Sequence, residues 1–495
     1  MSISVLLCTE GTYPFSGGGV STWCDILCRE LSEIDYTIYT ITANPEVTYS
    51  YQPPPTARKL IQIPLWGSHD PAERILPHLS FREIRRRKKA TTDALVEAEF
   101  VPLLRRFLRG MACDPSEISA HASVIYEIWS YFQRYDWKRS WKSRPAWEAF
   151  VEEVMRPYRG REAELAPYEV PSMYDLTTAM RWLYHFMTPL GAPVPKTDIV
   201  HTTIAAFGGI PGIVAKHEYG TPFLVTDHGV WIRERYIAAS AGEYSFFAKR
   251  FLMSLSSFIS RANYLYADVV SPVTNFNRRW EIPYGVAAEK IEAIYNGVDP
   301  DLFVPAPKPP HRSQRPVVVA AARIFPLKDI ETMIRSAAVV RERIPDVHYL
   351  VHGSLDADVP YVEKCRALIA ELGLVQTFEL AGHHDRPAEV YTEGDLTALS
   401  SISEAFPYTV LESMSCGRPV VATDVGGVRE ALEGFGIIVP PRDPEAFGQA
   451  VIELLENPGF RFELGRRARE EVLAKYRISF SLEAYRELYH RLAGR

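Results

Sequence analysis

The sequence predicts two doubly wound α/β domains joined by a proline-rich linker. Short apolar runs rich in β-branched residues alternate with helical patterns in two separate series, which is typical of parallel sheets covered by helices. Residues 305–316 lie between the two series and hold five prolines in twelve positions, as expected for a linker. A chain of 495 residues with 47% hydrophobic composition is too long for one core and apolar enough for two.

The first series predicts an N-terminal domain over residues 1–300. Its expected strands are Ile3–Cys8, Ile199–Thr202, Phe223–Thr226 and Val269–Ser271. Residues 66–190 carry helical patterns without a clear strand, so they predict a helical subdomain inserted into this domain.

Two features of the insertion each have two interpretations. Ile125, Ile128, Trp129 and Phe132 recur at helical spacing, which favours helix packing over the stacking of saccharides on aromatic rings. The basic run at residues 82–89 favours a solvated helix face over contact with an anionic membrane or an acidic partner.

A glycine-rich loop follows the first expected strand. Gly17, Gly18 and Gly19 would let backbone N–H groups approach a phosphate or a sugar closely. The segment does not match the G-x-G-x-x-G fingerprint, so a nicotinamide cofactor is not supported. A simple tight turn is the alternative.

A histidine follows the third expected strand, in the segment Thr226-Asp227-His228-Gly229. Open α/β sheets bind ligands at the carboxyl ends of their strands, which favours a ligand contact for His228 over a structural role. Asp227 is open to a different interpretation, as a helix cap.

The second series predicts a C-terminal domain over residues 301–478. Its first strand, Val317–Ala321, leads to Arg323 and Lys328, two cations five positions apart. Cations in this position can stabilise a departing nucleoside diphosphate without a metal ion, although an ordinary surface pair is the alternative. Further strands are expected at 349–351, 378–380, 396–402 and 420–423. A last helix at 479–495 is expected to pack back onto the first domain.

Two glutamates flank the start of a helix predicted at residues 409–416. Glu404 lies in the loop after a buried strand, and Glu412 lies early in the helix.

Between the two glutamates, the backbone forms a predicted anion site. The N–H groups of Tyr408, Thr409 and Val410, just after Pro407, are expected to be free at the positive end of the helix dipole. Two carboxylates beside such a site favour a phosphorylated polyhydroxy ligand, and a nucleotide sugar fits this description.

Composition excludes several other classes of protein. The net charge of −6 argues against a general nucleic-acid binder. The six cysteines show neither a CxxC pair nor zinc spacing, which favours a reducing cytosol and no bound metal. No run of about 20 uninterrupted apolar residues predicts a membrane span, and Met1–Cys8 lacks the basic start of a signal peptide.

In this order, these motifs resemble those of glycosyltransferase family 4, retaining enzymes with the GT-B fold of two facing Rossmann-like domains. The resemblance rests on the E-x7-E element of Glu404 and Glu412, the Arg323/Lys328 pair, Asn296–Asp299, and Gly426-Gly427 with Glu430. It implies a nucleotide-sugar donor, no cofactor and no metal. It also implies a front-face reaction in which the leaving phosphate deprotonates the acceptor, while a carboxylate nucleophile stays an alternative.

The resemblance also implies roles for individual residues. Glu412 binds the ribose and Glu404 the donor sugar, while Arg323 and Lys328 hold the diphosphate. The donor is further bound by His228, by the backbone of Gly18 and Gly19, by Gly382 and His383 against the base, and by Pro407, Tyr408, Thr409 and Val410 at the helix start.

More narrowly, Glu10–Pro14, Gly18–Ser21 with Trp23, and Asp227–Gly229 with Arg233–Arg235 resemble PelF-type enzymes. These are cytosolic glycosyltransferases of exopolysaccharide synthesis in a family that uses UDP-sugars. The resemblance implies a UDP-hexose or UDP-N-acetylhexosamine donor, a growing saccharide as acceptor, and a cytoplasmic protein. Attachment at the inner face of the membrane, beside polysaccharide synthase subunits, stays open.

Two alternatives keep the fold and change the function. One is a phosphorylase, or a transferase that uses an ADP- or GDP-sugar. The other is a non-catalytic assembly subunit of a membrane polysaccharide synthase, and the intact set of charged residues favours an enzyme over it.

Overall fold

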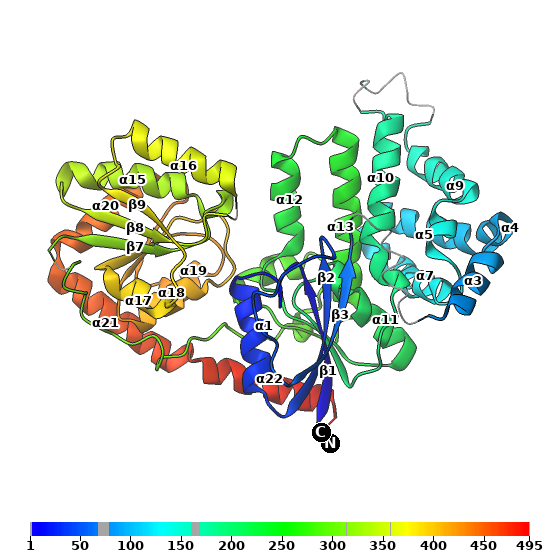
Figure 1. Cartoon of the computed structure of the whole chain (residues 1–495), viewed down its shortest axis with the longest axis horizontal. Coiled ribbons are helices and arrows are strands. Elements are labelled where there is room, and N and C mark those ends of the chain that lie inside the picture. The colour runs from blue at the N-terminus through cyan, green and yellow to red at the C-terminus, as the bar shows by residue number, and fades with distance from the viewer. Residues whose placement is uncertain are drawn as a thin grey trace. The chain divides into compact units, whose positions relative to one another are not determined.

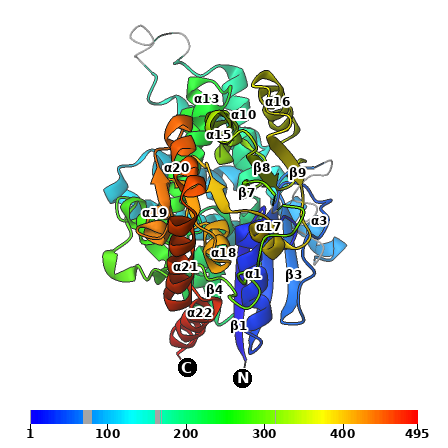
Figure 2. The ribbon, with the colours of Figure 1, turned by 90° about the vertical axis from the view of Figure 1, so that its left-hand side faces the viewer.

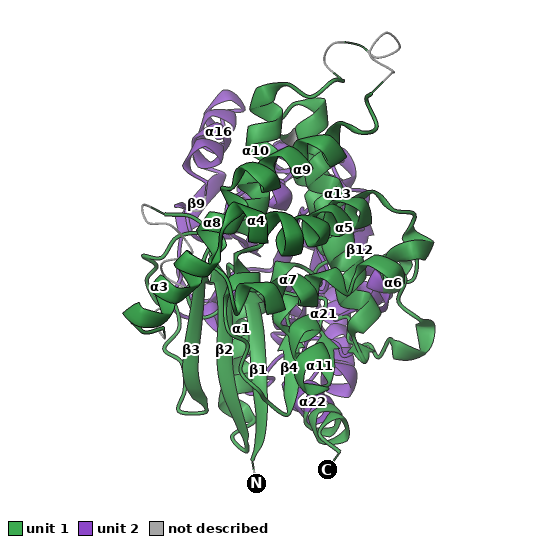
Figure 3. Ribbon diagram, turned by 90° about the vertical axis from the view of Figure 1, so that its right-hand side faces the viewer, with its two compact units in different colours: residues 1–272, 278–293, 486–495 green, residues 273–277, 294–485 purple. Residues whose placement is uncertain are grey.

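The computed structural model describes residues 2–494 except 68–78, 160–165, 167–168, 313 and 357. The chain forms two compact units, shown in green and purple in Figure 3. The first unit contains residues 1–272, 278–293 and 486–495, and the second contains residues 273–277 and 294–485.

The first unit is built on a six-stranded parallel sheet in the order β3-β2-β1-β4-β5-β6. The strands are β1 Ile3–Glu10, β2 Ile34–Thr42, β3 Ala57–Pro64, β4 Ile199–Thr202, β5 Phe223–Val225 and β6 Val269–Val270. Sequence patterns predicted four of these strands and missed β2 and β3. In β2, tyrosines and threonines replace a continuous aliphatic run, and β3 is an edge strand with only two buried residues.

The predicted helical insertion lies between β3 and β4, except for the parts outside the described residues. Its helices are α3 Phe81–Ala90, α4 Asp93–Leu95, α5 Val101–Ala112, α6 Ile118–His121, α7 Val124–Phe132, α8 Trp137–Trp141, α9 Arg144–Met155 and α10 Met173–Phe186 (Figure 1). The aromatic stripe packs in the core, where Phe132 lies 4.3 Å from Trp137 between ring centroids. The basic run forms α3, which buries no residue.

The remaining helices of the first unit connect consecutive strands of the sheet or follow β6. They are α1 Gly19–Glu30, α11 Ile210–Tyr219, α12 Trp231–Ala241, α13 Phe246–Tyr266 and α14 Arg278–Glu281.

The second unit is also a six-stranded parallel sheet, in the order β12-β11-β10-β7-β8-β9. Its strands are β7 Val317–Ala321, β8 His348–His352, β9 Phe378–Gly382, β10 Leu396–Leu399, β11 Val420–Thr423 and β12 Ile437–Val439. Only β12, which has three residues, was missed from the sequence.

Helices cover both faces of this second sheet. Its helices are α15 Ile330–Arg343, α16 Val359–Glu371, α17 Pro387–Glu393, α18 Tyr408–Ser415, α19 Val428–Leu432, α20 Pro444–Glu456 and α21 Pro458–Lys475. Figure 1 shows α15, α16 and α20 on one face and α17, α18 and α19 on the other.

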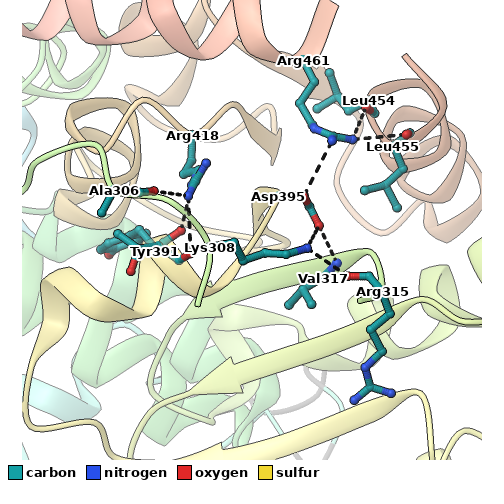
Figure 4. A network of polar contacts seen from close by, with 11 residues as sticks. Ala306, Lys308, Arg315, Val317, Tyr391, Asp395, Arg418, Leu454, Leu455 and Arg461 are labelled. Carbon is teal, nitrogen blue, oxygen red and sulfur yellow. Dashed lines mark hydrogen bonds and ion pairs between the residues drawn. The ribbon is translucent and has the colours of Figure 1, made fainter. Parts of the chain in front are cut away.

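Polar contacts hold the proline-rich segment on the second unit (Figure 4). Lys308 Nζ lies 2.6 Å from Asp395 Oδ2, which also accepts from the Val317 N–H at 2.8 Å. Arg418 donates to the carbonyl oxygen of Ala306 at 2.7 Å. Desolvation lowers the pKa of Arg418, which stays charged because an arginine titrates far above neutrality.

The last helix, α22 Ile478–Leu492, follows α21 at the end of the chain (Figure 2). Its residues from Arg486 onward belong to the first unit. There, the Tyr489 hydroxyl lies 2.7 Å from Nδ1 of the buried His201, and Arg486 pairs with Glu33 at 2.7 Å.

Candidate active site

The predicted site residues fall into two groups, each within its own unit. Gly18, Gly19 and His228 belong to the first unit. The others lie in the second unit, at the end of β9, in the loops that follow β7, β9 and β10, and in the first turns of α18.

Arg323 and Lys328 lie in the loop between β7 and α15. The Arg323 side chain is exposed, with its guanidinium carbon 5.1 Å from the centroid of the Phe325 ring. It makes no ion pair within the described residues. The start of this loop lies against Gly353, the residue after β8. A Cβ atom at position 353 would overlap the carbonyl oxygen of Ala322, so a glycine is required at that position.

Lys328 forms an ion pair with Glu404. The two side chains are only 20% and 11% exposed, and Ser401 Oγ donates to the same Glu404 oxygen at 2.6 Å. A pair shielded from water to this degree interacts more strongly than a surface pair. Sequence reasoning assigned these residues to different parts of a ligand and did not predict their contact.

A second loop fixes the backbone of Glu404. Gly426 has a φ of 59°, and a Cβ atom there would overlap the Glu404 carbonyl oxygen. The Gly427 N–H donates to the Ala405 carbonyl oxygen at 2.6 Å. The two glycines therefore let the loop after β11 lie directly against the Glu404 loop.

Helix α18 begins at Tyr408, one residue before the predicted start, with Pro407 as its N-cap. The prediction of a free N–H was wrong for Val410, whose N–H donates to the Pro407 carbonyl oxygen at 3.2 Å. The helix stops at Gly417, as predicted, where φ is 68°.

The Glu412 side chain lies on α18 and accepts a hydrogen bond from the hydroxyl of Tyr391 on α17. Desolvation raises the pKa of Glu412 to about 7, and the Tyr391 hydrogen bond acts in the opposite direction. Arg418 Nε donates to the carbonyl oxygen of the same tyrosine at 3.3 Å. Tyr391 is fully buried, so this hydroxyl is held in one place.

Replacing Tyr391 with phenylalanine is expected to raise the pKa of Glu412 by roughly one to two units, because a hydrogen bond to the charged form is lost. If Glu412 binds a nucleotide as a carboxylate, binding at pH 7 weakens in this variant and recovers at higher pH. Calorimetric titration across pH measures both effects. Tyr39→Phe is the matched control, since its buried hydroxyl has no partner among the described residues. An unchanged pH midpoint would contradict the assignment.

Gly382 is the last residue of β9, and His383 follows it. Gly382 has a φ of 78°, and its carbonyl oxygen accepts from the Gly353 N–H at 2.8 Å. The His383 side chain is 75% exposed. The turn is thus fixed by its backbone, while the imidazole is open to solvent.

Glu430, on α19, anchors residues 273–277 to the second unit. Its Oε2 atom accepts from the Asn275 N–H at 3.0 Å and lies 3.1 Å from the Tyr295 hydroxyl. Nearby, Asn296 Nδ2 donates to the Phe406 carbonyl oxygen at 2.9 Å. These contacts support the loop that carries Glu404.

In the first unit, the glycine-rich loop leads directly into a helix. Gly18 has a φ of 135° and caps α1, whose first residue is Gly19. No side chain caps this helix start, which leaves its N–H groups to other partners.

His228 lines a pocket of about 250 Å³ in the first unit. Three polar atoms of its lining residues are buried without a hydrogen-bond partner among the described residues: Thr12 Oγ1, His228 Nε2 and Arg235 Nε. Burial lowers the pKa of His228 to about 3, so the imidazole is neutral at pH 7. Its ring lies 4.5 Å from that of Trp23.

Glu10, Thr12 and Arg235 were not predicted to be site residues, although they lie in the motifs Glu10–Pro14 and Arg233–Arg235. Glu10 accepts from the Gly208 N–H at 3.0 Å, and burial raises its pKa. These side chains line one pocket because β1 ends and α12 begins at the same edge of the sheet.

Asp227 is not a helix cap, because α12 is capped by Val230. Instead, its carboxylate is fully buried and accepts from the Tyr264 hydroxyl at 2.6 Å and the Ala205 N–H at 3.2 Å. Desolvation and the neighbouring Asp227 raise the pKa of the fully buried Glu281.

Glu281→Gln is expected to stabilise the protein at alkaline pH. The folded protein retains the Glu281 proton at pH values where the unfolded chain has lost it, so stability falls as pH rises above the usual glutamate range. Glutamine cannot ionise, so urea unfolding of the variant should show a weaker decline between pH 5 and about 8. Glu289→Gln, at an exposed site in the same segment, is the control. Equal pH slopes in wild type and Glu281→Gln would refute this.

Within the described residues, no group of three or more His, Cys, Asp or Glu side chains could hold a metal ion. No helix in that part of the chain is both long and apolar enough to cross a membrane.

The fold defines a class of protein. Over 99% of both chains, the structure resembles sucrose-phosphate synthase from Thermosynechococcus elongatus, with a TM-score of 0.62 and 17% identity. It also resembles Anabaena HepE in complex with UDP and glucose over 98% of this chain and 99% of that one, with a TM-score of 0.58 and 14% identity. The protein therefore has the GT-B fold of glycosyltransferases, as predicted.

The chain belongs to the family described as "Domain of unknown function (DUF3492)", which matches residues 3–289. Residues 306–471 match "Glycosyl transferases group 1". The D-inositol 3-phosphate glycosyltransferase of Thermobispora bispora is 28% identical over 53% of this chain, and that of Mycobacteroides abscessus is 32% identical over 41%. The chain spans 63% and 46% of the lengths of these two curated relatives.

Proposed function

We propose that this protein is a retaining glycosyltransferase that moves a sugar from a UDP-sugar to a growing saccharide. The observation that carries the proposal is the arrangement in the second unit. There, the Lys328–Glu404 ion pair, the exposed Arg323 and the Tyr391-bound Glu412 surround the carboxyl end of one parallel sheet. The match to glycosyl transferases group 1 over this unit supports it.

Each residue takes a role that fits its charge. Arg323 and Lys328 bind the diphosphate, and Glu412 accepts hydrogen bonds from the ribose hydroxyls. Glu404 accepts from hydroxyls of the donor sugar and holds the Lys328 ammonium in place. In the first unit, the pocket contains buried polar atoms of Thr12, His228 and Arg235 that lack hydrogen-bond partners among the described residues. The hydroxyls of a bound sugar would supply these partners.

The reaction breaks the bond between the anomeric carbon and the diphosphate oxygen and forms a bond to an acceptor oxygen on the same face of the sugar. The acceptor proton passes to the leaving phosphate. Negative charge grows on the diphosphate as the bond breaks, so the two cations act mainly on the transition state. We assign no cofactor or metal to this step.

A UDP donor, rather than ADP or GDP, is favoured by the PelF-like motifs and by fold neighbours such as Anabaena HepE, described in complex with UDP and glucose. The same motifs lead us to propose a cytoplasmic role in exopolysaccharide synthesis, beside membrane-bound synthase subunits. The contrasting role, a non-catalytic assembly subunit, has no use for the largely shielded Lys328–Glu404 pair.

Slow hydrolysis of donor sugars tests the proposal without a known acceptor. The purified chain is incubated with UDP-, ADP- and GDP-glucose and with UDP-N-acetylglucosamine, and the released nucleotide and the anomer of the free sugar are followed. We expect UDP release with retained configuration, and its loss in Glu404→Ala. No release from any donor would favour the assembly subunit, and an inverted anomer would exclude a retaining reaction.

A further inference from the structure

A second pocket, of about 330 Å³, lies in the first unit among α5, α9 and α13. Its lining residues come from these three helices and the segments next to them, and include Met111, Cys113, Phe247, Arg250 and Phe251. None of these residues belongs to the two groups described above. The volume is in the range of small-molecule sites.

One wall of this pocket, formed by α5 and α13, is apolar. Leu108 and Met111 on α5 and Phe247 and Phe251 on α13 are at most 9% exposed and belong to the core of the first unit. Residues four apart on a helix share one face, so the two phenylalanines present a continuous surface. Such a wall offers few partners to the hydroxyls of a sugar and favours a hydrocarbon chain.

Among the described residues, the rim of the pocket carries a cation that makes no ion pair. Glu153 is neutralised by Arg109 at 2.6 Å and Arg105 at 3.2 Å, with Arg156 3.7 Å away. Arg250 lines the pocket, is exposed, and makes no ion pair within the part of the chain that the structure describes. Phe246 lies one helical turn before Arg250 on α13, and this aromatic residue is 51% exposed.

We propose that this pocket binds a single-chain anionic amphiphile, with the hydrocarbon chain against the phenylalanine wall and the anionic head group on Arg250. An uncharged apolar ligand would leave the guanidinium unused, and a small anion would leave the wall empty. This inference goes beyond the proposed function and does not depend on it, because it concerns neither the sheet edges nor the nucleotide.

Cys113 provides the measurement. It lines the pocket and is half-buried, whereas the other five cysteines are buried, so it is expected to react first with a maleimide. Labelling is followed by mass spectrometry in the presence of octyl, decyl or dodecyl phosphate below micelle formation, with laurate to compare head groups. Dodecanol and inorganic phosphate are the two single-feature controls.

We expect dodecyl phosphate to protect Cys113, with affinity rising about fourfold for each added methylene until the pocket is full. Arg250→Ala should weaken this binding about tenfold while leaving dodecanol unaffected. Lys249→Ala, which removes the neighbouring cation outside the pocket, is the matched control. Ala112→Trp, at an exposed lining position, should fill the pocket and remove protection.

Three results would overturn the proposal. They are equal protection by inorganic phosphate alone, an affinity that does not depend on chain length, and dodecyl phosphate binding that survives Ala112→Trp. Circular dichroism checks that each variant is folded. If Ala112→Trp does not fold, Arg250→Ala still tests the proposal, because Arg250 is exposed and its replacement breaks no ion pair within the described residues.

Discussion

Lys328→Ala is expected to lower kcat by about 10²–10³-fold, the usual effect of removing one group that stabilises transition-state charge. The affinity for UDP should fall by less than about tenfold, because negative charge on the diphosphate is greatest in the transition state. Arg323→Ala should show the same asymmetry. Donor hydrolysis gives kcat, and calorimetry with UDP gives the affinity.

Arg343→Ala is the control for this experiment, since it removes an exposed cation that pairs with Glu456 on the same unit. Equal losses in kcat and in UDP affinity would contradict a transition-state role. Lys328 also holds Glu404, so the double variant Lys328→Ala/Glu404→Ala should cost much less than the sum of the two single changes.

Gly426→Ala is expected to destabilise the protein by about 2–5 kcal/mol and to abolish activity. The alanine Cβ atom would overlap the Glu404 carbonyl oxygen, and the residue would also have to adopt a φ of 59°. The left-handed conformation costs about 1–2 kcal/mol, and overpacking against backbone adds about 1–3 kcal/mol. Urea unfolding gives the free energy, and donor hydrolysis gives the activity.

Gly434→Ala separates the two contributions. Gly434 has a φ of 82°, and a Cβ atom there would come no closer than 3.9 Å to Arg467 Nη2. This control should therefore lose only the conformational cost of about 1–2 kcal/mol and keep its activity. If Gly426→Ala behaves like Gly434→Ala, the loop after β11 does not fix Glu404.

The parts of the fold that the sequence predicted are those with strong local signals. β7 and β8 are runs of buried residues, and α18 is bounded by Pro407 and Gly417. Strand β2 was missed because buried tyrosines and threonines replace aliphatic residues, and their burial follows from neighbours far along the chain.

The candidate site was predicted less completely, because its contacts depend on tertiary structure. Glu404 and Glu412 stood out by their spacing, but nothing in the sequence pointed to Tyr391 as the partner of Glu412 or to Lys328 as the partner of Glu404. A helix cap was the alternative interpretation of Asp227, since short acidic residues near helix starts usually have that role. Its burial beside Glu281 brings together residues 54 positions apart.

The central claim is that the second unit binds a nucleoside diphosphate through Glu412. Calorimetric titration of the wild type with UDP, ADP and GDP, repeated on Glu412→Ala, tests it most directly. Glu453→Ala, at an exposed position on α20, serves as the matched control. We predict that UDP binds most tightly and that its affinity falls about tenfold or more in Glu412→Ala alone. A wild type that binds none of the three nucleotides, or a Glu412→Ala variant that binds UDP unchanged, would contradict the claim.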